Sequence, residues 1–456
     1  MKSSTSHASM RVMDMTTGHP LRLILAFALP LFIGNLFQQA YSMVDTMVAG
    51  YNLGNTAIAA IGATSSLYSL LIDFASGLNS GYAIVVTQQF GARNSKALRE
   101  SVAGMIELDI LITTGLTILS LVFLKPLMHF MNTPDSIFNE AYSYIVIICA
   151  GMPATIAYNL FASILRAVGN SRTSLYFLMV STVLNIVLDL FFIMVLHTGV
   201  GGAALATIIS QAVSALLSGL YVYKHYRSIM PKRQDFRVPH SMLTELFSQG
   251  IAMGLMLCVV DIGSVIFQRA NNSLGEMIIS AHTSSRRIIG IMMQPINTIA
   301  TASSTFIGQN WGAGKTSRIR QALKQVLSLE IAWSVTAFLL VLAFGSVLVR
   351  WSTGTTDAAM VENAVMSLRL HLAFFPALSC LLVLRTALQA MGRKLIPILS
   401  SCLELGMKIL AAAVLIPRFG FLGTSITEPI TWTLMLLFLA GNFWIRRKTL
   451  FHVAAA

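Results

Sequence analysis

Residues 21–48 read LRLILAFALPLFIGNLFQQAYSMVDTMV, an almost unbroken apolar run in which Arg22 and Asp45 are the only charged residues. A helix needs about 20 mainly apolar residues to cross the hydrocarbon core of a bilayer. The run is long enough to span a membrane and too long for the apolar region of a cleavable signal peptide. We therefore expect a membrane-spanning first helix that is retained.

The rest of the chain has the same character. Of its 456 residues, 55% are hydrophobic and 11% are charged, whereas a soluble domain carries about 25% charged residues. This composition excludes an ordinary water-soluble enzyme and indicates an all-α integral membrane protein. The net charge of +13 then reflects membrane topology, and we expect no nucleic-acid partner.

Twelve apolar stretches are separated by short polar turns and by one longer basic segment. They are residues 21–48, 57–86, 98–124, 141–165, 175–196, 203–222, 242–268, 277–307, 319–348, 361–384, 395–416 and 424–445. The sequence therefore predicts twelve transmembrane helices, six on each side of the basic segment.

Lysine and arginine residues gather at alternate ends of these stretches, and only Lys125, Arg269, Arg350 and Arg418 lie at the opposite ends. By the positive-inside rule, both termini and the central segment are cytoplasmic. The predicted organisation is a polar N-terminal tail (1–20), a six-helix bundle (21–223), a cytoplasmic linker (224–241), a second six-helix bundle (242–446) and a C-terminal tail (447–456).

The two halves also match each other in sequence. A shift of 221 residues aligns Leu53-Gly54 with Leu274-Gly275, Gln88 with Gln309, Gly91-Ala92 with Gly312-Ala313, Gly199 with Gly420 and Gly202 with Gly423, and a shift of 223 aligns Gly169 with Gly392. An even number of spans gives both repeats one orientation, so an axis along the membrane normal is expected to relate the two bundles. Repeats of this kind hold substrate at their interface and work by alternating access.

Polar residues inside the apolar stretches need a reason, because an acidic side chain at the bilayer centre costs about 3 kcal/mol. The first stretch carries Asn35, Gln38, Ser42 and Asp45 on one helical face. We interpret Asp45 as an ion-coupling residue and the other three as cavity-lining residues. The alternative for Asp45 is an ionised side chain that simply reaches water at the end of the helix.

The fifth and sixth stretches carry a second polar group. Asn185 and Asp189 are one helical turn apart, and Thr207 and Gln211 begin a polar stripe in the next helix. Carboxylate, amide and hydroxyl oxygens suit Na⁺, and two carboxylates brought together can share a proton. The alternative is a buried hydrogen-bonded network that joins helices.

The second stretch has Ser66, Ser69 and Asp73 on one face. We interpret these residues as cavity lining together with Gln211. The alternative is close packing of small residues between helices.

The second half does not repeat these groups. Its intramembrane charges are Glu404, Lys408 and Glu428, and under the two shifts Lys408 falls on Asn185 and Glu428 on Thr207. Glu404 and Lys408 form an i,i+4 pair. We interpret Glu404, Lys408 and Glu428 as structural charges, and we expect the lysine ammonium to occupy the place that a mobile cation takes in the first half. The alternative for Glu404 and Lys408 is a plain ion pair that joins the last two helices. Ion exchange would then occur only in the first half.

Arg286 and Arg287 lie in the eighth stretch, where they could bind anions in the cavity or pair with Asp261 in the seventh. We favour pairing with Asp261. The role of the two arginines stays open at this point.

No catalytic cluster or nucleotide site is evident. The four cysteines lie in apolar stretches without metal-site spacing. The segment from Gly308 to Thr316 has five residues between its glycines where a phosphate-binding loop has four. We expect no enzyme activity and no cofactor, so an ion gradient or the substrate gradient must supply the energy.

Several segments, in this order and spacing, resemble the multidrug and toxic compound extrusion (MATE) family. They are Pro30 with Val44-Asp45-Thr46, Gln88-Gln-Phe-Gly-Ala92, Leu165-Arg-Ala-Val-Gly169, Asn185 with Asp189, Gly202-Ala-Ala-Leu-Ala-Thr207 and Gln309-Asn-Trp-Gly-Ala313.

The resemblance implies a twelve-helix antiporter that expels amphipathic, often cationic compounds in exchange for H⁺ or Na⁺. It also implies that Asp45, Asn185, Asp189 and Thr207 form the cation site, and that they hold a metal only if Na⁺ is the coupling ion. Some members carry acidic residues in the seventh and tenth helices, whereas Val259 and Leu378 stand near those positions here.

The sequence therefore predicts an exporter of amphipathic cations that acts as a monomer in the cell membrane. The alternative function is a flippase for a lipid-linked precursor, which would favour a strongly cationic cavity for pyrophosphate. The acidic first half argues against the flippase.

Overall fold

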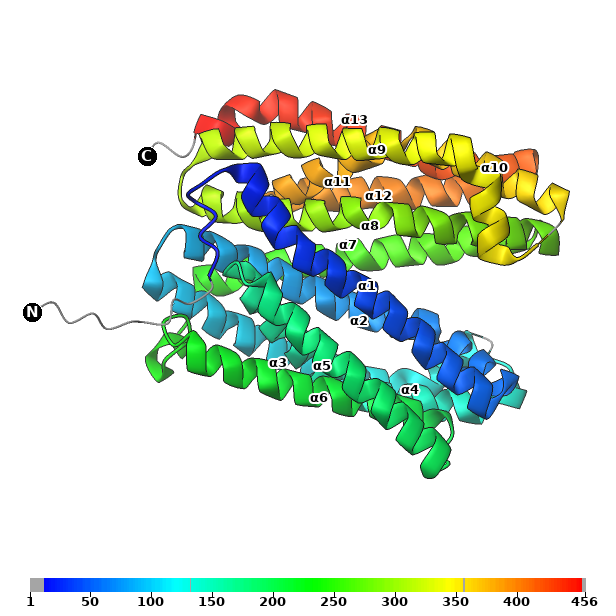
Figure 1. The fold of residues 1–456 in the computed structure, drawn as a ribbon. Helices are drawn as coiled ribbons and strands as arrows, with labels where there is room; N and C mark the ends of the chain where they lie inside the picture. The colour runs from blue at the N-terminus through cyan, green and yellow to red at the C-terminus, as the bar shows by residue number, and fades with distance from the viewer. Residues whose placement is uncertain (1–11, 132, 356, 453–456) are drawn as a thin grey trace, which may run out of the picture. The chain divides into compact units, whose positions relative to one another are not determined.

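The computed structural model describes residues 12–131, 133–355 and 357–452, and within these residues the secondary structure is entirely helical (Figure 1). The chain divides into two compact units, and the division falls inside two helices. Residues 19–28 belong to the second unit and residues 29–250 to the first. Helix α1 (Pro20–Leu53) thus begins in the second unit and continues in the first from next to Pro30. Helix α7 (His240–Asn272) begins in the first unit and continues in the second after Gly250.

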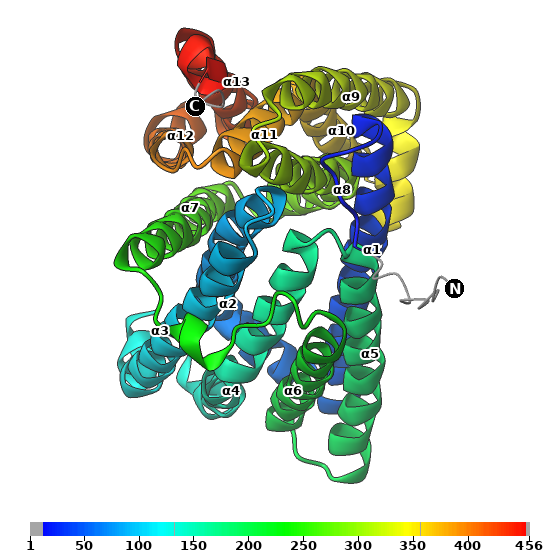
Figure 2. The same ribbon diagram turned by 90° about the vertical axis from the view of Figure 1, so that its left-hand side faces the viewer.

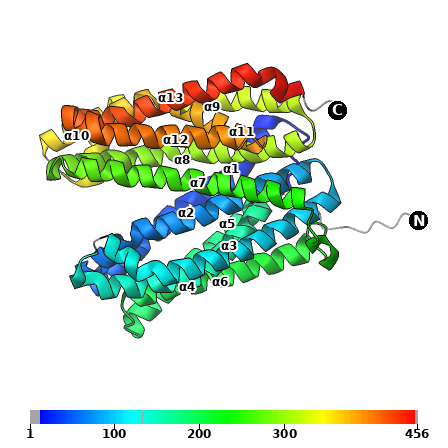
Figure 3. The same cartoon turned by 180° about the vertical axis from the view of Figure 1, so that it is seen from behind.

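The first unit is built around α4. Besides parts of α1 and α7 it contains α2 (Asn55–Gly91), α3 (Ser95–Phe130), α4 (Asp135–Ala167), α5 (Ser171–Leu190), the π-helical turn η1 (Phe191–Val195), α6 (Val200–His225) and the 3₁₀ turn η2 (Arg233–Phe236). Helix α4 packs against α2, α3, α5 and α6, and Figure 3 shows it running alongside α3 and α6.

The second unit is built around the broken pair α10–α11. Its helices are most of α7, then α8 (Glu276–Gly312), α9 (Thr316–Thr353), α10 (Ala358–Ala373), α11 (Phe375–Ala390), α12 (Leu395–Leu410), the π-helical turn η3 (Ala411–Leu415) and α13 (Ile416–His452). In the view of Figure 2, α11 lies among α8, α9, α12 and α13, all of which it contacts. The fourth span is therefore the central one in both units.

The twelve predicted spans are confirmed. Nine described helices are long and apolar enough to cross a membrane, or ten if α10 and α11, bent by 48°, count as one broken span. The remaining two are explained locally. Residues 395–446 pass as one helix although non-helical Gly420 divides them into two spans, and α8 falls short because polar side chains and two arginines interrupt it.

The internal repeat is confirmed in the backbone. Positive φ angles occur at equivalent positions in the two halves: Gly54 and Gly275, Arg93 and Gly314, Gly169 and Gly392, Gly199 and Gly420. The π-helical turns η1 and η3 also correspond, since η1 follows α5 and η3 follows α12, the fifth span of each repeat. Glycine adopts a positive φ without steric cost, so the repeated glycines mark turns that both halves require.

The linker after α6 is attached to α3 by Asp235, whose side chain is buried. Asp235 Oδ2 accepts hydrogen bonds from the backbone N–H of Lys232 at 2.8 Å and from Arg99 Nε at 3.0 Å. The bond from Lys232 is the main cause that lowers the pKa of Asp235 below its usual value; Arg99 adds to the effect, and burial opposes it.

Asp235→Ala is expected to lower the stability of the detergent-solubilised protein by about 2 kcal/mol, because it removes the buried charged acceptor of two hydrogen bonds. A lowered carboxyl pKa stabilises the folded state above the unfolded pKa of about 3.9 and loses that effect as pH falls through the folded value. Thermal unfolding at neutral pH should therefore show the full difference, which should shrink as the pH falls below about 4. Asp135→Ala, at the exposed start of α4, is the control; an equal loss there would contradict the anchoring role of Asp235.

Candidate ion-coupling and substrate site

Helices α5 and α6 bring three of the four predicted coupling residues together in the first unit. Asn185 and Asp189 are each 1% exposed, and Thr207 is also buried. Asn185 Nδ2 donates to Thr207 Oγ1 at 3.3 Å, and the hydroxyl of Tyr41 in α1 lies 3.3 Å from the same oxygen. Asn185 Oδ1 is buried and has no hydrogen-bond partner among the described residues. The amide oxygen is therefore free to bind a ligand.

Helix α1 carries the fourth predicted residue. Asp45 lies one turn after Tyr41 in this helix. The side chains of Asp45 and Ser42 fall outside what the structure describes. Their roles in coupling and in lining therefore stay predictions.

A cavity of about 90 Å³ lies beside the Asn185–Thr207 pair. Five helices of the first unit line it, through Gln38, Tyr41, Tyr68, Ile72, Thr155, Tyr158, Asn159, Leu178, Ser181, Thr182, Asn185, Ser210 and Gln211. A drug-sized ligand fills a pocket of about 300–1,000 Å³. The cavity therefore has room for an ion, a few waters or one small group of a larger molecule.

Two of the predicted lining residues, Gln38 and Gln211, do line this cavity. Asn35, Ser66, Ser69 and Asp73 are not among its lining residues, and their role in substrate contact stays a prediction.

The sequence analysis missed other lining residues, among them Thr155 and Asn159 in α4 and the three tyrosines. Thr155 and Asn159 form an i,i+4 polar pair inside an apolar helix, which is a signal that could have identified them. The tyrosines give no such signal, because aromatic residues are ordinary in membrane helices.

The second unit holds a charged group at the repeat position of Thr207. Both carboxylate oxygens of Glu428 in α13 lie within 2.6 Å of Arg286 Nη1 in α8. His371 Nε2 in α10 lies 3.4 Å from Glu428 Oε2, and its Nδ1 donates to the carbonyl of Ser367 at 2.7 Å. The expected pairing of Arg286 with Asp261 is therefore corrected: Arg286 pairs with Glu428, because its long side chain reaches the carboxylate of α13.

A second charged group is centred on Glu404 in α12. Its Oε1 lies 3.0 Å from Lys408 Nζ, and its Oε2 lies 3.6 Å from Arg385 Nη2 in α11. Lys408 Nζ also donates to Ser264 Oγ in α7 at 3.0 Å. The ion pair thus connects α12 to α11 and α7. Lys408 also interacts electrostatically with Glu428 of α13, so the alternative that the pair joins the last two helices stays open.

The two units therefore differ at equivalent positions. Where the first unit has the neutral donor and acceptor groups of Asn185 and Thr207, the second has the ammonium of Lys408 and the carboxylate of Glu428. The second unit supplies its own cations through Lys408, Arg286 and Arg385. A mobile cation has less to gain there, because the carboxylates are already neutralised.

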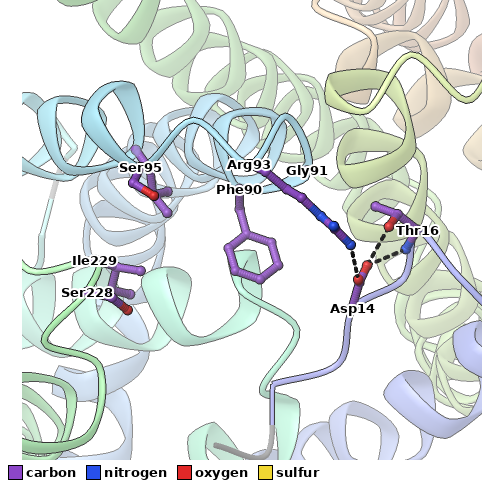
Figure 4. A pocket seen from close by; sticks show the side chains of 9 residues that line it. Asp14, Thr16, Phe90, Gly91, Arg93, Ser95, Ser228 and Ile229 are labelled. Atoms are coloured by element: carbon purple, nitrogen blue, oxygen red, sulfur yellow. Dashed lines mark hydrogen bonds and ion pairs between the residues drawn. The ribbon is translucent and has the colours of Figure 1, made fainter.

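A larger cavity, of about 250 Å³, lies in the first unit between the turn after α2 and the segment after α6. Figure 4 shows Asp14 pointing at Arg93, with Nη2 and Oδ2 3.0 Å apart, and bonded to Thr16. Burial acts to raise the pKa of Asp14, but the bonds from Thr16 and Arg93 outweigh it and lower the pKa. The pair neutralises Arg93, so this cavity, which Asp14 and Thr16 help to line, offers no free cation from that residue.

The chain matches one protein-family model, described as MatE, over residues 30–191 and 252–414. The matched segments cover more than half of the chain and correspond to the two repeats. They include Asn185 and Asp189 of the candidate site.

Curated relatives and solved structures agree with this match. The chain is 28% identical to the "Probable multidrug resistance protein YpnP" of Bacillus subtilis, covering 85% of this chain and 86% of the relative. It is 24% identical to the "Probable multidrug resistance protein YoeA" of the same organism, covering 92% and 93%. A solved structure described as "Crystal structure of MATE in the bent conformation" superimposes with a TM-score of 0.89 at 21% identity, covering 97% of this chain and 98% of the other. At that identity the structural likeness establishes the shared fold.

Proposed function

Because the chain belongs to the MatE family, we propose that it exports amphipathic cations in exchange for H⁺ or Na⁺, and that the first unit carries the coupling ion. Membership of this family makes the chain a multi-pass membrane transporter of the multidrug efflux class, driven by an ion gradient, and not an enzyme. The coupling ion, the substrate and the residues that bind them are our proposal.

The observation that carries the proposal is the free amide oxygen of Asn185, held beside Thr207 and one turn from buried Asp189. Together with the carboxylate of Asp45 on α1, these groups supply oxygens for Na⁺ or two carboxylates that share a proton. The Tyr41 hydroxyl links α1 to this site through Thr207. An ion bound here would therefore act on the position of α1.

The lining of the cavity favours a cationic substrate group. The rings of Tyr41, Tyr68 and Tyr158 contribute to it, and the faces of aromatic rings attract organic cations. The cavity of about 90 Å³ fits a cationic head group, and the apolar body of the substrate would lie outside it. Two of the curated relatives are named as multidrug resistance proteins, in agreement with substrates of this kind.

The flippase alternative is weaker. A pyrophosphate ligand needs unpaired cations, and Arg286, the leading candidate, is engaged with Glu428. Arg287, the second arginine of the eighth stretch, keeps that alternative open. We further propose that the protein lies in the plasma membrane with both termini in the cytoplasm. Its proposed functional form is a monomer.

The substrate affinity of the purified protein is expected to fall as the pH drops from about 8 to about 6, or as Na⁺ is added, because either ion neutralises carboxylates that attract a cationic substrate. Asp45→Asn should flatten this dependence. The measurement is equilibrium binding of a fluorescent amphipathic cation, with Asp135→Asn as the control outside the site. An affinity that neither ion changes would contradict antiport and favour a flippase or a uniporter.

A further inference from the structure

Besides Asp235 of the linker, two buried acidic residues lie outside the site described above. Asp109 in α3 and Glu330 in α9 are separated by 221 residues, the shift that relates the two repeats. Each lies about 14 residues into a helix that is long and apolar enough to span a membrane. The fold therefore keeps an acid at one equivalent position in both units.

Glu330 is completely buried, and neither of its carboxyl oxygens has a hydrogen-bond partner among the described residues. Two neighbouring serine hydroxyls are engaged with other groups: Ser334 Oγ donates to the backbone carbonyl of Glu330 at 2.8 Å and lies 3.3 Å from Ser379 Oγ. No ion pair of Glu330 occurs within the described part of the chain.

Within the described part of the chain, no cationic group on α8, α10 or α11, the helices that pack against α9, forms an ion pair with Glu330; His282 and Arg287 of α8 and Arg369 of α10 are included. Cys380 of α11 is the titratable group that interacts with it. Arg286 of α8 and His371 of α10 are engaged with Glu428. Arg385 of α11 is engaged with Glu404.

An ionised carboxylate in these surroundings would pay a large desolvation penalty with nothing to compensate it, so the group takes up a proton instead. Sodium is a poor alternative, because it needs several oxygen ligands and the two serine hydroxyls are already bonded. The chemistry of the position therefore selects H⁺.

Asp109 provides a contrast within the same molecule. Asn79 Nδ2 donates to Asp109 Oδ1 at 3.0 Å, and a hydrogen bond of this kind favours the ionised form. Under the same shift Asn79 falls on Ala300, which has no donor to offer Glu330. The first unit thus supplies a hydrogen-bond donor to the acid at the position where the second unit supplies none.

We propose that Glu330 is a proton-binding site of the second unit, loaded in the packing seen here and unloaded when that packing changes during transport. Loss of the proton has to be accompanied by a rearrangement that brings water or a cation to the carboxylate, so proton occupancy and the packing of α9 are linked. The proposal rests on the proposed antiport and extends it, because it adds a second ion site and names the ion.

Infrared spectroscopy of the purified full-length protein tests the protonation directly. At neutral pH the wild type should show the C=O band of a buried carboxylic acid, and Glu330→Gln should lack that component. Glu362→Gln, at an exposed position of α10, is the control and should keep it. A Glu330→Gln spectrum identical to that of the wild type would overturn the proposal.

Transport in proteoliposomes tests the role of the proton. Glu330→Gln mimics the protonated acid permanently, so efflux driven by a pH gradient should be lost while substrate binding persists. Glu330→Asp, which keeps an acid, should retain a pH response and guards against a folding defect in the glutamine variant. Unchanged proton-driven efflux in Glu330→Gln would contradict the proposal and show that Glu330 is a neutral structural residue. Wild-type protein that transports nothing under any gradient would instead contradict the proposed function. The infrared measurement would still test the protonation of Glu330, because it does not depend on transport.

Discussion

Asp189→Asn is expected to abolish gradient-driven efflux while leaving expression and membrane insertion intact. Asparagine has nearly the same shape, so the buried packing at the end of α5 should persist, but it can neither release a proton nor supply a charged ligand. The variant should let a substrate cation equilibrate without accumulating it. Asp45→Asn is expected to behave in the same way.

The size of the effect follows from the driving force. One elementary charge moving through about 100 mV releases about 2.3 kcal/mol. At about 1.36 kcal/mol per factor of ten, this sustains roughly a 50-fold substrate gradient. For each charge exchanged, the wild type can sustain roughly a 50-fold concentration ratio of substrate across the membrane. In each variant this ratio should fall to about one.

The measurement is the steady-state concentration ratio of a fluorescent cation in inverted vesicles or proteoliposomes at equal protein level, with H⁺ and Na⁺ gradients imposed separately. Asp135→Asn, at the exposed start of α4, should transport normally. If Asp189→Asn sustains the wild-type ratio, Asp189 takes no part in coupling.

The second large effect is expected at Glu404, where single substitutions should differ in a definite order. Glu404→Gln leaves both Lys408 and Arg385 without a carboxylate, and an uncompensated buried charge costs about 3–5 kcal/mol. Lys408→Met should cost less, because Arg385 remains beside Glu404 at 3.6 Å. Thermal unfolding and size-exclusion profiles in detergent give the order directly.

Multiple substitutions separate stability from transport. From the sequence alone, Glu404→Gln with Lys408→Met would restore a neutral core, but the structure adds Arg385, which the double variant leaves unpaired. Full recovery should therefore require Arg385→Met as a third change, since replacing a whole buried charged group by apolar residues can be nearly neutral. A double variant as stable as the wild type would show that the Arg385 contact contributes nothing. A stable triple variant without transport would contradict the structural role of these charges and give Glu404, Lys408 or Arg385 a part in transport.

The sequence by itself determined the number of spans, the internal repeat and the polar face of α5. Spans are readable because a helix in lipid must be apolar over its whole length. The repeat is readable because the turns at Gly54 and Gly275 need a positive φ that glycine adopts freely. Asn185 and Asp189 share a face through helical periodicity alone.

The tertiary structure alone decided which polar groups meet. Arg286 and Glu428 are 142 residues apart, and Tyr41 and Thr207 are 166 apart. In a soluble protein the apolar side of a helix reveals which face is buried, but lipid is as apolar as the interior of the protein. Asp109 and Glu330 are visible in the sequence as acids in apolar helices, yet only the packing of α3 and α9 makes one hydrogen-bonded and the other isolated. The orientation of a membrane helix about its own axis is set by contacts with its neighbours, and those contacts are not encoded in its local pattern.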